Sequence, residues 1–200
     1  MQPPTKLQEF WSWFKTNEER LFQFERDQDN VFDELAHALA DVSPELTFEF
    51  GPVDDGKREF IISAGGVKNA FPFVEMLARS APELPRWTIL KYRQRRDPIM
   101  EMSINGTTVN PEDVEVALMS NGRELGIRLF FDGYTKDTHQ LWGMFGYLFL
   151  DQALGEFDVE TKLGMIDFAS TTTKGDAVTY PLPKLPELFD MHVSKLSQVH

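Results

Sequence analysis

The chain has 200 residues, of which 42% are hydrophobic, with no cysteine and a formal net charge of −12. The lack of cysteine excludes disulfides, thiolate metal sites and cysteine nucleophiles, and no segment reaches the ~20 apolar residues of a transmembrane helix. The acidic charge disfavours nucleic acids and anionic membranes as partners, because affinity for both depends on basic residues. The composition predicts one domain, spanning residues 1–200, in the cytoplasm.

Residues 1–44 are predicted to be helical. Thr5 and Gln8 have the spacing of a capping box at the start of the first helix. Trp13 lies off the apolar stripe of that helix, which predicts that the helix is covered on two sides. The helical segment ends before Ser43-Pro44, because the residue before a proline resists the α conformation. The stripe consists of Leu7, Phe10, Trp11 and Phe14.

Residues 45–96 predict a first ββαβ unit. Apolar and polar residues alternate over 46–50, and a turn leads to a second strand at 57–64, so the two form an antiparallel hairpin. Apolar residues stand on consecutive positions in the second strand, which predicts burial on both faces. Gly65-Gly66, a helix and a strand at 87–93 complete a parallel crossover.

The second half of the chain repeats this order. A short hairpin at 97–110 is followed by a second ββαβ unit at 111–169, whose first two strands turn at Asn121-Gly122. A Pro-rich arm and a short helix at 170–200 are expected to cover the domain. Duplication of one unit and independent convergence both explain the shared order.

The helix of the second unit, predicted over 137–154, is apolar on all sides, so we expect deep burial. Asp137 and Gln140 suggest a capping box at its start. Gly143 and Gly146 leave room for another segment to approach its backbone closely. The elements together predict an α+β fold, in which N-terminal helices pack on a mixed sheet built from two ββαβ units.

Several motifs in the first half of the chain form a set. They are Phe10-Trp11-Ser12-Trp13-Phe14 with Asn17-Glu18, Leu46-Thr47-Phe48-Glu49-Phe50-Gly51-Pro52, Glu59-Phe60-Ile61-Ile62-Ser63-Ala64-Gly65-Gly66 with Phe71, Ala81-Pro82-Glu83-Leu84 with Trp87, and Arg93-Gln94-Arg95. In these motifs the chain resembles an uncharacterised bacterial family of cytosolic proteins of unknown function. The resemblance implies a bacterial cytosolic protein of similar length and implies no activity, so no functional residue is carried over.

The candidate ligand-binding residues lie on the first sheet. Glu49 and Glu59 are on paired strands, and Lys91, Arg93 and Arg95 share one face at the far end of the crossover strand. Open sheets often bind ligands at the carboxyl ends of their strands, and arginine binds carboxylates and phosphates through paired hydrogen bonds. The pattern predicts an anion pocket. The alternative is a set of cross-strand ion pairs.

No catalytic residue, metal site or cofactor is predicted, since the histidines are far apart and no nucleophile elbow is present. We therefore expect a non-enzymatic binding or regulatory module that recognises a protein or a small anionic ligand. The first alternative is an enzyme built around the carboxylates and arginines of the predicted pocket. The second is an assembly protein that uses sheet edges or the aromatic N-terminal helix.

Overall fold

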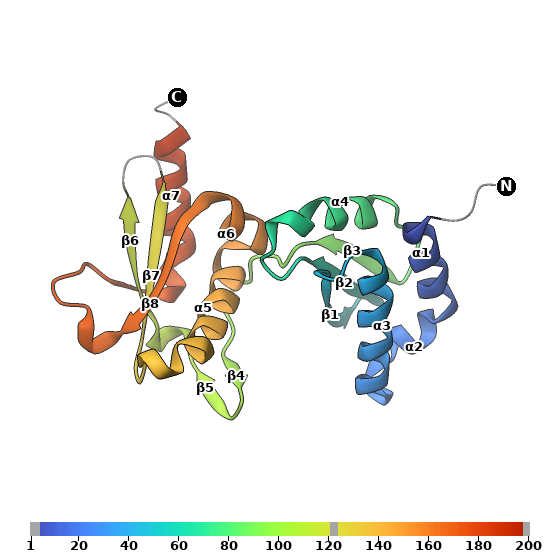
Figure 1. The fold of residues 1–200 in the computed structure, drawn as a ribbon, viewed down its shortest axis with the longest axis horizontal. Helices are drawn as coiled ribbons and strands as arrows, with labels where there is room; N and C mark the ends of the chain where they lie inside the picture. Colours follow the sequence, from blue (N-terminus) through green and yellow to red (C-terminus); the bar gives the residue numbers. More distant parts are fainter. Residues whose placement is uncertain (1–4, 121–123, 198–200) are drawn as a thin grey trace. The chain divides into compact units, whose positions relative to one another are not determined.

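A hairpin and a parallel crossover form the sheet of the first half, as predicted (Figure 1). The computed structural model describes residues 5–120 and 124–197, and the chain divides into two units, Met1–Arg93 and Gln94–His200, each considered by itself. The expectation of a single domain stays a prediction. In the first unit, β1 pairs antiparallel with β2, and β2 pairs parallel with β3. The elements are β1 (Thr47–Asp54), β2 (Lys57–Ser63), α4 (Phe71–Arg79) and β3 (Trp87–Lys91).

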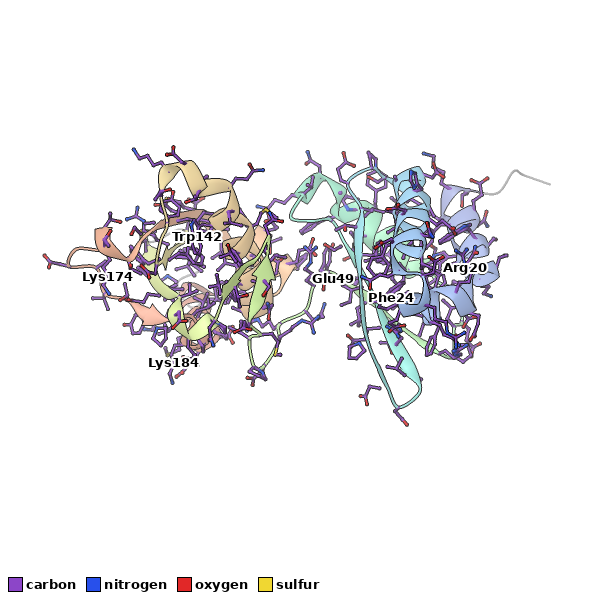
Figure 2. All side chains as sticks on the ribbon, turned by 90° about the horizontal axis from the view of Figure 1, so that it is seen from below. Arg20, Phe24, Glu49, Trp142, Lys174 and Lys184 are labelled. Carbon is purple, nitrogen blue, oxygen red and sulfur yellow. The ribbon has the colours of Figure 1, made fainter. Side chains whose placement is uncertain are left out.

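The N-terminal segment is helical, as expected. It contains α1 (Lys6–Thr16), α2 (Glu18–Phe22), a 3-10 turn (Phe24–Arg26) and α3 (Gln28–Val42). The predicted capping box is present: the Thr5 side chain accepts from the Gln8 backbone, and the Gln8 side chain accepts from the Thr5 backbone. Figure 2 shows Phe24 between these helices and the sheet, whereas Arg20 lies on the outer side of the helices.

An aromatic core joins the helices of the first unit to its sheet. Residues of α1, α3 and α4 share one buried cluster with Phe60 and Ile62 of β2. The Phe60 ring lies 5.0 Å from Phe14 and 5.6 Å from Phe50, measured between centroids. Ile61 points to the opposite face of β2 and is only 2% exposed, so the predicted burial of this strand on both faces is confirmed.

The second unit has the same hairpin, helix and strand order. β6 pairs antiparallel with β7, and β7 pairs parallel with β8. The elements are β4 (Met102–Ile104), β5 (Thr107–Val109), β6 (Glu115–Ser120), β7 (Leu125–Phe131), α5 (His139–Leu154), α6 (Glu156–Lys162) and β8 (Leu163–Ser170). The predicted α+β fold with two ββαβ units is therefore confirmed, although each unit builds its own sheet instead of sharing one. The predicted turn at Asn121-Gly122 lies outside the described residues.

Two expectations for the second unit were wrong in detail. The capping box before α5 is formed by Thr135 and Thr138, not by Asp137 and Gln140, because a 3-10 turn precedes the helix. α5 ends at Leu154, as predicted, and α6, which was not predicted, follows Gly155 directly. α5 is not buried all round, since side chains on one side are exposed, namely Met144 and Tyr147.

The C-terminal segment covers its own unit, as expected. A two-residue strand, β9 (Tyr180–Pro181), pairs with β6 and precedes α7 (Leu185–Ser197). Leu182, Leu185 and Phe189 are completely buried in the core of this unit. Within residues 5–120 and 124–197, no helix is long and apolar enough to cross a membrane.

Candidate functional site

The structure brings two of the predicted pocket residues together. Glu49, on β1, and Arg93, which follows β3, form an ion pair with 2.5 Å between Oε1 and Nε. Their side chains are 34% and 18% exposed. This contact joins β1 to the segment that follows β3, on the other side of β2.

Lys91 contacts a carboxylate on the crossover helix. Its Nζ donates to both oxygens of Glu75, at 3.1 and 2.9 Å, and the Tyr92 hydroxyl donates to the same carboxylate at 3.2 Å. The hydrogen bond from Lys91 is the main cause that lowers the pKa of Glu75. Lys91 therefore connects β3 to α4.

Arg95 belongs to the second unit. Its guanidinium donates to both carboxylate oxygens of Asp190 on α7, at 2.9 and 3.0 Å, and to Asp158 on α6 at 3.1 Å. Its Nε donates to the backbone carbonyl of Leu154. The hydrogen bond to Asp190 is the main cause that raises the pKa of Arg95. The Arg95 side chain therefore connects α5, α6 and α7.

Glu59 lies against the backbone of β1. A Cβ added at Gly51 would lie 2.9 Å from its Oε2. The predicted residues thus make separate contacts: Glu49 with Arg93, Lys91 with Glu75, and Arg95 with carboxylates of the second unit. An anion binding to these cations would have to displace carboxylates that already neutralise them.

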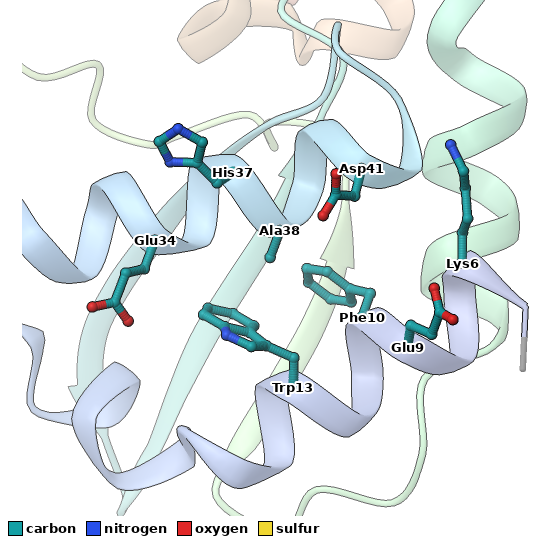
Figure 3. A pocket seen from close by; sticks show the side chains of 8 residues that line it. All are labelled: Lys6, Glu9, Phe10, Trp13, Glu34, His37, Ala38 and Asp41. Carbon is teal, nitrogen blue, oxygen red and sulfur yellow. The ribbon is translucent and has the colours of Figure 1, made fainter.

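A different cavity lies in the first unit, between α1 and α3. Its volume is about 400 Å³. Figure 3 shows the rings of Phe10 and Trp13 projecting from α1 toward α3. We call this cavity the α1–α3 groove; it is lined by Lys6, Glu9, Phe10, Trp13, Glu34, His37, Ala38 and Asp41.

Helix packing produces the α1–α3 groove. Phe10 is buried in the core, whereas Trp13 lies on the flank of α1 and is only partly buried, with 6.3 Å between the two ring centroids. α3 presents Ala38 at this level, and a methyl group leaves space that a larger side chain would fill. The groove therefore has an aromatic wall on α1 and a small residue opposite.

Carboxylates dominate the rim of the groove. Glu9, Glu34 and Asp41 stand against one lysine, Lys6. Glu34 forms two hydrogen bonds with Arg20, at 2.8 and 3.1 Å, and the hydrogen bonding from Arg20 lowers the pKa of Glu34. From Asp27 to Gly56 the sequence contains no lysine or arginine, although it contains nine aspartates and glutamates. Four of these acidic residues lie on α3, which has no lysine or arginine, so α3 is an acidic helix.

The groove was not predicted from the sequence. One signal for it is Trp13, whose position off the apolar stripe predicts cover on a second side of the helix, and α3 contacts that side. A second signal is the run of acidic residues without lysine or arginine.

Neither metal chemistry nor similarity identifies the protein. Among the residues that the structure describes, no group of three or more histidines, aspartates or glutamates is arranged to hold a metal ion. Comparison of the chain with protein-family models, with curated proteins and with solved structures gave no match. The resemblance to a bacterial family of unknown function stays a prediction.

Proposed function

We propose that the protein is a non-enzymatic binding module and that the α1–α3 groove holds part of its partner. The observation that carries the proposal is the groove itself. Its volume of about 400 Å³ lies within the range of ligand sites, and it combines aromatic rings with a few ionisable groups, as such sites do.

The positions of the predicted pocket residues favour binding over catalysis. The enzyme alternative required Glu49, Glu59, Arg93 and Arg95 to converge in one cleft. Glu49 and Arg93 meet, whereas Arg95 contacts carboxylates of α6 and α7. These ion pairs have an evident structural role, which is to tie neighbouring elements together.

The test fills the groove without removing a core side chain. Ala38→Leu places a larger side chain in the groove, and Ala36→Leu makes the same change on an exposed position of α3 that does not line it. Both variants are screened by thermal shift, together with the unmodified protein, against acidic, basic and neutral peptides and against small anions and cations. A ligand at one hundred times its Kd stabilises a protein by about 2.7 kcal/mol.

We expect at least one probe to stabilise the unmodified protein and Ala36→Leu but not Ala38→Leu. The proposal is wrong if no probe stabilises the protein, or if every stabilising probe acts equally on Ala38→Leu. An anion that binds Ala38→Leu normally but fails to bind Arg93→Ala would restore the predicted anion pocket instead.

A further inference from the structure

We infer that the α1–α3 groove recognises the cationic side chains, arginine above all, of a basic segment of a protein partner. This inference rests on the proposed function and specifies its ligand. The first argument is charge. The groove carries three carboxylates against Lys6, and α3 has two more exposed carboxylates outside the groove, Asp29 and Asp33.

The second argument comes from two sites in the same unit where an arginine is held by an aromatic ring and a carboxylate. The Arg86 guanidinium lies 3.7 Å from the centroid of Phe22 and contacts Glu19 at 2.6 Å. The Arg58 guanidinium lies 4.6 Å from the centroid of Phe24. Each site combines the attraction of the ring face with that of a carboxylate.

The groove offers this combination to an outside group. Trp13 is the ring type that attracts cations most strongly, and it lines the same groove as Glu9, Glu34 and Asp41, with the Phe10 ring between it and Glu9. Within the part of the chain that the structure describes, no lysine or arginine lies over the Trp13 ring. Arg20 already donates to both carboxylate oxygens of Glu34, so Glu9 and Asp41 are the main carboxylates for an incoming cation.

The extent of the acidic surface favours a peptide segment over a small cation. A small cation would contact the groove alone. A segment with several basic residues would place one side chain in the groove and others along Asp29 and Asp33, which lie one helical turn apart on α3. Complementary charge over such a surface accelerates association and selects against acidic partners.

The test measures binding of a short fluorescein-labelled peptide of alternating arginine and glycine to the full chain, by fluorescence polarisation. The matched probe replaces arginine by citrulline, which keeps the shape and removes the charge. We expect the citrulline peptide to bind at least about tenfold more weakly, because the cation–π and charge-assisted contacts are lost.

Variants locate the binding. Trp13→Leu is expected to weaken binding of the arginine peptide about tenfold, and Ala38→Leu is expected to abolish it. Glu9→Lys/Asp41→Lys should weaken it more than Glu83→Lys/Glu112→Lys, a control that changes the net charge equally at exposed positions outside the groove. Urea unfolding of every variant separates loss of binding from loss of folding.

Each other outcome overturns the inference. Equal binding of the citrulline peptide would show that charge is not recognised, and equal loss in both double variants would show that only the net charge matters. Competition by free arginine amide at the affinity of the peptide would make the ligand a small cation. If an acidic or neutral probe binds in a manner that depends on Ala38, the proposed function stands and this inference fails; if no probe binds, both fail.

Discussion

Two glycines of α5 provide a quantitative test of the packing in the second unit. Gly143 and Gly146 both face Phe168 on β8. A Cβ added at Gly143 would lie 3.7 Å from Phe168 Cε2, an ordinary contact. A Cβ added at Gly146 would lie 2.1 Å from Cε1 and 2.8 Å from Cδ1 and Cζ, a distance that no structure tolerates. We therefore expect Gly143→Ala to be more stable than Gly146→Ala.

The magnitude follows from two terms. Alanine is more favourable than glycine in a helix interior by about 1 kcal/mol, and Gly143→Ala should gain roughly that amount in free energy of unfolding. Gly146→Ala gains the same term but must displace the Phe168 ring, which is 6% exposed and contacts the rings of Phe131 and Tyr147. Overpacking of this kind costs about 1–3 kcal/mol. Because the helix term cancels, the two variants should differ by about 1–3 kcal/mol.

Urea unfolding followed by circular dichroism measures this difference, provided that the m values are unchanged. Phe168→Leu in the Gly146→Ala background should relieve the clash, so a double-mutant cycle should give a favourable coupling energy of about 1 kcal/mol or more. If Gly146→Ala is as stable as Gly143→Ala, or if the cycle shows no coupling, the close approach of Phe168 to α5 is wrong.

Two further predictions concern charged groups. Arg58 is 5% exposed, lies over the ring of Phe24 and donates to Glu25 and to the Gly51 carbonyl. Arg58→Ala should therefore lower the free energy of unfolding by about 2–3 kcal/mol. A loss under about 0.5 kcal/mol, measured by urea unfolding, would contradict this prediction. The Lys174 hydrogen bond lowers the pKa of Glu115. A lowered folded pKa stabilises the protein above the unfolded value of about 4.3 and this contribution disappears as pH falls through the folded pKa. The stability difference between the unmodified protein and Glu115→Gln should therefore shrink as pH falls below about 4, and a difference that stays constant would refute the assignment.

The fold was predictable because its strands carry clear patterns. Strict alternation in β1 and three consecutive apolar residues in β2 determine which faces are buried, and a strand buried on both faces implies a crossover. The parts that were missed have no such pattern. β9 has only two residues, too few to show a period. α6 begins directly after Gly155, whose positive φ of 82° ends α5 without ending the helical segment.

The predicted pocket could be judged only partly from the sequence. Glu49 shares a face with Leu90 in the register of the sheet, whereas Arg93 follows Tyr92, whose positive φ of 62° ends the alternation of β3, so strand periodicity does not explain why Glu49 and Arg93 meet. The partners of the other cations depend on helices that pack from elsewhere in the chain: Lys91 contacts Glu75 on α4, and Arg95 contacts Asp190 on α7. Strand periodicity gives the face on which a side chain lies, but tertiary packing decides which charge it meets.

The acidic surface of α3 weakens the helix that carries it. Asp29 and Asp33 are like charges four residues apart, which destabilises a helix by about 0.2–0.5 kcal/mol. Asp41 lies in the last turn, where the helix dipole disfavours a carboxylate and where α3 has no basic residue. Helix stability therefore disfavours these carboxylates at their positions in α3. Residues that are locally unfavourable in this way are expected at functional sites.

Asp41→Lys therefore separates stability from binding. The change places a cation at the C-terminal end of α3, so it should raise the free energy of unfolding by about 0.3–1 kcal/mol at low salt. The same change removes a carboxylate from the groove, so it should weaken binding of the arginine peptide. Asp41→Asn is the matched variant, with a smaller effect in the same direction on both measurements. A variant that is more stable and binds the peptide as well as the unmodified protein would place the cation site elsewhere, because the rim carboxylate would then have no part in recognition.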